Sequence, residues 1–138
     1  MFYKYAGNYS VELLQLHDDK FFVFGDNMKR YGKKGQAIVR DECNAMGIAT
    51  KFAPSNDSYA FFTDAELPVI ITEIVSDLKK INYASQRRSV VVPVTSDGRI
   101  SLGLGLAKLD VKAPVIYSII ATYLESLAQD KSDRKSVV

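Results

Sequence analysis

Short, unbroken runs of apolar residues alternate along the chain with longer stretches in which apolar residues recur every three or four positions. Two of the runs, residues 21–24 and 89–94, are rich in aromatic and β-branched side chains, as is typical of strands that are covered on both faces. Between them, Ile70, Ile74 and Leu78 share one face of a predicted helix that begins at a capping box, Thr63-Asp64-Ala65-Glu66. The pattern predicts a strand, a helix and a second strand in that order.

Weaker patterns add further elements around these three. Residues 2–5 predict a short edge strand, and Ser10 is expected to cap a short helix that follows it. Good helix formers over residues 36–46 predict a helix that stops at Gly47, and residues 47–53 predict another short strand. A final helix is expected to begin at Pro114, because the amide hydrogen that proline lacks would be unpaired there.

Strands separated by helices predict a single α/β domain over residues 1–127. The expected fold class is a three-layer α/β/α sandwich with right-handed crossovers and a mixed or mostly parallel sheet. Residues 128–138 are polar and mixed in charge, which predicts a flexible polar tail. Sheets of this kind bind ligands at the carboxyl ends of their strands, so the loops at those ends are the first place to look for function.

Composition narrows the classes of function. The chain has 138 residues, with 18 Lys and Arg against 16 Asp and Glu. Its small net charge therefore gives no indication that it binds duplex nucleic acid or an anionic membrane. Cys43 and His17 are each the only residue of their type, and we predict neither a metal site nor a cofactor. No apolar run approaches the roughly 18 residues of a membrane span, and the start of the chain has no signal-peptide pattern, so we expect a cytoplasmic protein.

The loop after the first apolar run is rich in glycine and polar residues. Its candidate ligand-binding residues are Gly25, Asp26, Asn27, Arg30, Gly32, Gly35 and Gln36. Glycines let backbone amides approach a phosphate, and a helix start adds unpaired amides. The same glycines also suit plain turns, and Asp26 and Asn27 suit Asx turns at the end of a strand. Both interpretations stay open.

A second loop of similar composition follows the apolar run that ends at Val94. It contains Asp97-Gly98 and the pair Gly103 and Gly105. These glycines are candidates to form a second side of the same ligand-binding site. A β-hairpin with Asp-Gly as its turn would use the same types of residue, and this alternative also stays open.

Candidate catalytic residues are few. A single histidine and a single cysteine give no Ser-His-acid or Cys-His arrangement. If the protein is an enzyme, Asp26 or Asp97 would act on a water molecule as a general base, and the expected class is an ADP-ribosyl or nucleotide hydrolase.

Several short motifs, taken together, resemble a group of small phage and bacterial proteins. The motifs are Val23-Phe24-Gly25-Asp26-Asn27, Gly32-x-x-Gly35-Gln36-Ala37, Gly47-Ile48-Ala49-Thr50-Lys51 and Gly103-Leu104-Gly105-Leu106-Ala107. This group in turn distantly resembles the macro domains, which bind ADP-ribose. The resemblance implies a macro-domain-like α/β/α sandwich in which the ligand lies across two loops. Asp26, Asn27, Gly32 and Gly35 would match the first loop, and Asp97, Gly98, Gly103 and Gly105 the second.

The sequence leads to competing functional hypotheses. In the first, the protein binds a phosphate-bearing nucleotide, ADP-ribose or a relative, in a cleft at the carboxyl ends of the strands, with hydrolysis of ADP-ribosyl linkages as a further activity. In the second, it is a non-catalytic phage protein in the host cytoplasm that sequesters a host nucleotide signal or inhibits a host defence protein. In a third, it is an interaction module without a small ligand, and the loops serve only as turns.

Overall fold

A sheet of four parallel strands, in the order β1-β4-β2-β3, lies at the centre of the molecule. The computed structural model describes the backbone of residues 1–135 and the side chains of residues 1–127. The strands are β1 (Phe2–Tyr5), β2 (Lys20–Asp26), β3 (Ala45–Ala49) and β4 (Ser89–Pro93). The predicted α/β class is confirmed, and the pairing between these strands is parallel.

Side chains along the inner strands alternate between two buried faces of the sheet. Val23 and Val90 belong to the larger apolar cluster on one face, whereas Phe22, Phe24 and Val91 belong to a smaller cluster on the other. Because both faces are covered, neither strand shows the alternation of apolar and polar residues that marks a half-exposed sheet.

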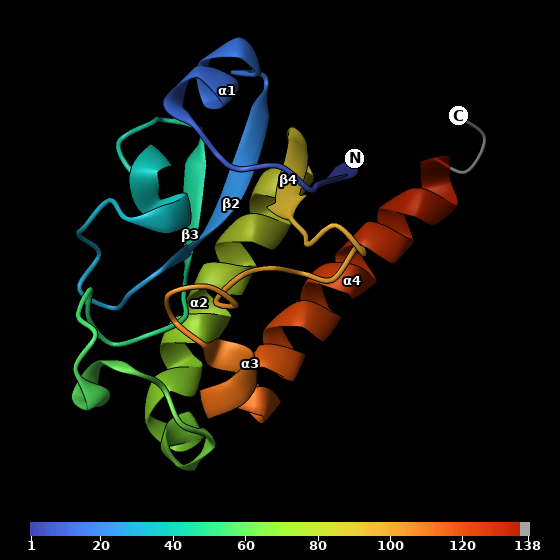
Figure 1. Cartoon of the computed structure of the whole chain (residues 1–138). Coiled ribbons are helices and arrows are strands. Elements are labelled where there is room, and N and C mark those ends of the chain that lie inside the picture. The colour runs from blue at the N-terminus through green and yellow to red at the C-terminus, as the bar shows by residue number, and fades with distance from the viewer. Residues whose placement is uncertain (136–138) are drawn as a thin grey trace.

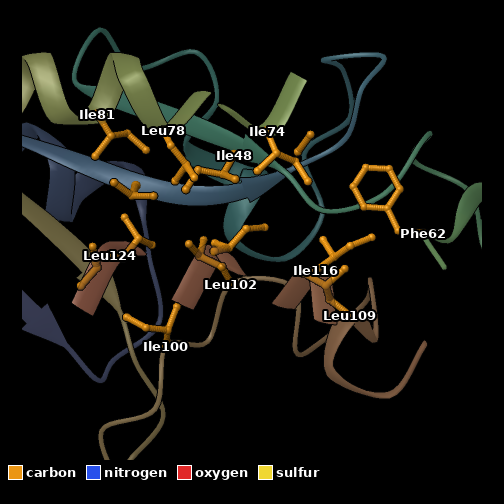
Figure 2. Packing of buried hydrophobic residues seen from close by; sticks show 14 of the residues in the cluster. Ile48, Phe62, Ile74, Leu78, Ile81, Ile100, Leu102, Leu109, Ile116 and Leu124 are labelled. Atoms are coloured by element: carbon orange, nitrogen blue, oxygen red, sulfur yellow. The ribbon is translucent and has the colours of Figure 1, made fainter. Parts of the chain in front are cut away.

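Two long helices cover the face with the larger cluster (Figure 1). They are α2 (Leu67–Ser85) and α4 (Pro114–Lys135). Leu78 and Ile81 from α2 meet Ile116 and Leu124 from α4 against the sheet (Figure 2). The predicted tail, residues 128–138, has a helical backbone as far as Lys135, and its side chains and residues 136–138 lie outside the described part of the chain.

The opposite face carries a thinner layer. It consists of α1 (Val11–Leu16) and a 3-10 helix, η1 (Gly35–Val39), which contribute Leu14 and Val39 to the smaller cluster. Tyr9 also packs here and donates its hydroxyl to the carbonyl oxygen of Val23 at 2.7 Å, and burial raises the pKa of this phenol. The result is a three-layer arrangement with one thick and one thin helical layer.

The predicted helix starts are confirmed. Ser10 caps α1 by accepting from the amide of Leu13 at 3.1 Å. Thr63 and Glu66 form the expected capping box around the 3-10 turn η3 (Asp64–Glu66), from which α2 continues. Asp64 additionally accepts from the first amides of α4, so this one segment holds the starts of both long helices.

The predicted helix over residues 36–46 is wrong. Only η1 is helical there, a turn follows, and β3 already begins at Ala45. The side chain of Asn44 donates to the carbonyl oxygens of Leu14, His17 and Lys20, which fixes the start of β3 beside the segment that leads into β2. These contacts join distant parts of the chain and outweigh the local helix propensity of residues 40–46.

The segment after β4 folds as the hairpin that the sequence left open. Val94 and Ile100 form an antiparallel bridge, and the amide of Gly98 donates to the carbonyl oxygen of Thr95 at 2.9 Å. Shorter helical turns, η2 (Ser58–Ala60) and α3 (Leu109–Lys112), complete the described elements. Among these elements, no helix has the length and apolar character that a membrane span requires.

Candidate functional site

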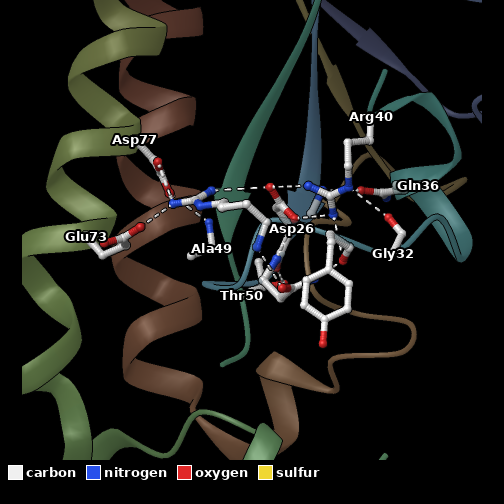
Figure 3. A network of polar contacts seen from close by, with 12 residues as sticks. Asp26, Gly32, Gln36, Arg40, Ala49, Thr50, Glu73 and Asp77 are labelled. Atoms are coloured by element: carbon white, nitrogen blue, oxygen red, sulfur yellow. Dashed lines mark hydrogen bonds and ion pairs between the residues drawn. The ribbon is translucent and has the colours of Figure 1, made fainter. Parts of the chain in front are cut away.

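Asp26 lies at the carboxyl end of β2 and is buried, with 6% of its surface exposed. Both of its carboxylate oxygens accept from Arg40, which follows η1, at 2.5 Å and 3.0 Å. The same guanidinium donates to the carbonyl oxygen of Gly32 at 2.8 Å. Arg40 thereby ties the loop after β2, through Gly32, to Asp26 at the carboxyl end of that strand (Figure 3).

Arg30 extends this network from the loop to α2. Its guanidinium lies 3.4 Å from Asp26 and makes shorter ion pairs with Glu73, at 2.7 Å, and Asp77, at 2.8 Å. Although burial opposes the charge of Arg30, hydrogen bonds with these two α2 carboxylates raise its pKa. Arg30 is therefore a permanent cation that ties the first loop to the long helix.

Asp77 carries the network to the outer edge of the sheet. One of its oxygens accepts from the backbone amide of Ala49 in β3 at 2.9 Å. Burial raises the pKa of the Asp77 carboxyl, and the hydrogen bond from Arg30 opposes that rise. A short ladder of alternating charges therefore runs from Arg40 through Asp26 and Arg30 to Asp77 (Figure 3).

An open cavity of about 430 Å³ lies against this network. Its charged lining consists of Asp26, Arg30, Arg40, Glu73, Asp77 and Lys80, and Phe24, Ala45, Met46, Gly47 and Ser76 complete the wall. Lys80 differs from the two arginines because the described residues give it no ion pair or hydrogen bond. Guanidinium and ammonium groups suit phosphate oxygens, and carboxylates suit hydroxyl donors.

The two glycine-containing loops also approach one another beside β2. The backbone amide of Gly25 donates to the side-chain oxygen of Gln36 at 2.9 Å. The side-chain nitrogen of Gln36 in turn donates to the hydroxyl of Ser101 at 3.3 Å. A Cβ atom on Gly25 would lie 3.4 Å from the amide nitrogen of Gly103. Gly25, Gln36 and Gly103, which the sequence placed in one site, are therefore neighbours in the fold.

The other predicted site residues do not line the cavity beside Asp26, although the backbone amide of Asn27 donates to a carboxylate oxygen of Asp26 at 2.7 Å. Asn27 closes its own turn, because its side-chain oxygen accepts from the amide of Arg30 at 3.0 Å. Asp97 is exposed in the hairpin, where a hydrogen bond from Thr95 lowers its pKa. A Cβ on Gly98 or Gly105 would meet open space, whereas one on Gly35 would lie 3.4 Å from Leu106.

A family model matches residues 4–123, and that family is described as a family of unknown function, DUF7831. The chain belongs to this family. No curated protein and no solved structure matches the chain.

The partners of Asp26 and Arg30 were not predicted from the sequence. Arg40 lies within the segment that was predicted as a helix, and no local pattern links Glu73 and Asp77 of α2 to the loop after β2. Asp77 could have indicated these contacts from the sequence, because it lies one helical turn after Glu73 and next to the apolar Leu78. A carboxylate near the apolar stripe of a helix calls for a cationic partner.

Although the net charge of the chain is near neutral, four cations gather near the end of α2. A hollow of about 750 Å³ near the end of α2 is lined by Phe21, Cys43, Met46, Lys79, Lys80, Tyr83, Ala84, Arg87 and Arg88. It contains four cations and no carboxylate, and it shares Lys80 and Met46 with the cavity beside Asp26. Positive charge therefore extends along the seam between α2 and β3.

Proposed function

We propose that the protein binds a phosphate-bearing nucleotide, with ADP-ribose as the leading candidate, in the cavity beside Asp26. The observation that carries the proposal is the convergence of Arg30, Arg40 and Lys80 with three carboxylates around one open cavity. The cations supply donors to phosphate oxygens, while the carboxylate of Glu73, of which only one oxygen is engaged by Arg30, accepts from ribose hydroxyls. A ligand with both types of group satisfies both halves of the lining.

The proposed activity is binding without turnover. Asp26 holds both of its oxygens on guanidinium groups, so neither is free to take a proton from water. Asp97 is engaged within its own exposed hairpin. These contacts favour a protein that sequesters a nucleotide signal over an ADP-ribosyl hydrolase, and they fit the hypothesis of a phage protein acting on its host.

The likeness to macro domains is part of the same proposal. It is supported by the parallel sheet, by helices on both faces, and by the close approach of Gly103, in the loop after β4, to Gly25 near the end of β2. A nucleotide held across those loops would extend from the cavity toward Gln36.

Titration calorimetry with ADP-ribose, NAD, ADP and cyclic nucleotides tests the proposal. Lys80→Ala is expected to weaken ADP-ribose binding by about tenfold, because it removes an unpaired cation that faces the phosphates. The matched control is Lys79→Ala, an exposed lysine on the same helix that does not line this cavity. It should bind as the unaltered protein does.

The outcomes separate binding from catalysis. Flat titrations across the panel, or equal weakening in both lysine variants, would reject the proposed site. Chromatography of the ligand after long incubation should return it unchanged. Recovery of hydrolysed product would leave the binding proposal standing and reject the non-catalytic one.

A further inference from the structure

Lys51 follows β3 at the carboxyl edge of the sheet and is 8% exposed. Its backbone is well held, since its carbonyl oxygen accepts from the amide of Met28 at 2.9 Å and it bridges to Phe61. Its ammonium group makes no hydrogen bond or ion pair with any described residue. Burial lowers the pKa of this lysine.

Every other buried polar side chain of the described residues has a partner within the chain. They are Asp26, Asn27, Asn44, Thr50, Asp77 and Ser85. No fully enclosed side-chain nitrogen or oxygen in this part of the chain lacks a partner, so the Lys51 ammonium must reach solvent at the end of its buried stem. Lys51 therefore presents to solvent donors that the described residues leave unused.

A second lysine shares the same aromatic ring. The ammonium groups of Lys51 and Lys112 each lie 4.8 Å from the centre of the Phe61 ring, so they are separated by no more than twice that distance. Lys112 belongs to α3 and, like Lys51, has no carboxylate partner among the described residues. Attraction to the ring holds each cation there, while the two like charges oppose one another.

We propose that Lys51 and Lys112 form a binding site for a phosphoryl group, either free phosphate or the phosphate ester of a small molecule. An anion that contacts both ammonium groups relieves their repulsion and accepts hydrogen bonds from the unused donors of Lys51. A phosphoryl group suits the pair better than a carboxylate, because it carries nearly two negative charges at neutral pH and more acceptor oxygens. This site is separate from the cavity beside Asp26, whose lining contains neither lysine.

The test uses the full chain and calorimetric titration with inorganic phosphate, glycerol 3-phosphate and acetate at low ionic strength. Lys51→Met keeps the unbranched apolar stem of the side chain without its ammonium group and should weaken phosphate binding by at least about tenfold. Lys112→Met should weaken it by a smaller factor, because Lys112 is exposed. Circular dichroism confirms that each variant folds. Tight binding of glycerol 3-phosphate indicates an ester ligand, and binding of inorganic phosphate alone indicates the free ion.

Proton uptake provides a readout that a purely structural lysine would not give. A bound anion raises the pKa of Lys51, so phosphate binding at a pH between its pKa in the free and in the bound state should take up protons in the unaltered chain and not in Lys51→Met. Lys79→Met controls for the loss of one positive charge and should bind phosphate normally.

Three results would overturn this proposal. They are the absence of phosphate binding, acetate binding as tight as that of phosphate, and phosphate binding that survives Lys51→Met. Phosphate binding that is lost only in Lys80→Ala would likewise reject the Lys51 site, and it would place the phosphate in the cavity of the proposed nucleotide site.

Discussion

Gly47 in β3 lies directly beside the carboxylate of Asp26. A Cβ atom at this position would lie 2.6 Å from one carboxylate oxygen of Asp26 and 2.9 Å from its Cβ. The absent side chain is therefore what allows Asp26 to sit against the edge strand and meet both arginines. One glycine in the strand is a condition for the whole charged network.

Gly47→Ala should destabilise the fold by about 3 kcal/mol, because the added methyl group displaces a buried carboxylate from its ion pairs. Urea denaturation measures the change. Gly105→Ala is the control, since a Cβ there meets nothing within 4 Å, and it should be neutral. Equal stability of the two variants would show that Asp26 can move at little cost.

Lys51 represents the opposite situation at the residue level, a cation on a buried stem with no hydrogen-bond or ion-pair partner among the described residues. Lys51→Met should raise the melting temperature at pH 7 by about 3 °C, since it replaces a desolvated cation with an apolar side chain of similar length. Thermal denaturation followed by circular dichroism measures this. A lower melting temperature would contradict the prediction.

The increase in melting temperature caused by Lys51→Met should depend on pH in a defined direction. Burial lowers the pKa of Lys51 in the folded chain, whereas unfolding returns it to about 10.4. As pH rises from the folded-state value toward 10.4, the folded protein sheds the costly proton and its stability increases. The advantage of Lys51→Met should therefore shrink over that interval.

At the scale of elements, the segment that holds Thr63 and Asp64 organises both long helices. Glu66 accepts from the amide of Thr63 at 3.0 Å, which fixes the start of α2. Asp64 accepts from the amides of Val115 and Ile116, each at 3.0 Å, which caps α4 and complements the positive end of its dipole. The starts of the two helices that cover one face of the sheet are thus held by residues of one short segment.

Asp64→Ala should cost about 1 kcal/mol of stability, the usual effect of losing a helix cap. Chemical denaturation provides the measurement. Asp57→Ala is a suitable control because Asp57 is exposed and its carboxylate makes no contact with a described residue. A loss of the same size in both variants would mean that net charge, and not capping, is responsible.

Local signals were sufficient for some elements and not for others. The strand at residues 21–24 and the helix after Thr63 follow from runs, periodicity and caps that lie within a few residues. The error at residues 36–46 arose where the decisive contacts are remote, from Arg40 to Asp26 and from Asn44 to Leu14. Propensity cannot anticipate contacts that only the assembled sheet provides.

At the scale of the whole molecule, the topology explains why half of the candidate site could be predicted. Parallel pairing brings the carboxyl end of β2, which carries Gly25 and Asp26, to the same end of the sheet as the carboxyl ends of β3 and β4, which a general rule for α/β folds anticipates. The other half comes from α2, whose Glu73 and Asp77 reach the loop around the edge strand. The sequence does not indicate which helix packs beside the edge strand β3.

The contact between Asp77 and Ala49 also bears on how molecules of this protein behave toward one another. β3 is an outer strand of the sheet, and free amides along such a strand are templates for pairing with a strand from another chain. Asp77 occupies the amide of Ala49, and Arg30 lies across the same end with its charge. Growth of the sheet into intermolecular aggregates is thereby blocked at the end of the strand nearest the candidate site, where a ligand must be able to enter.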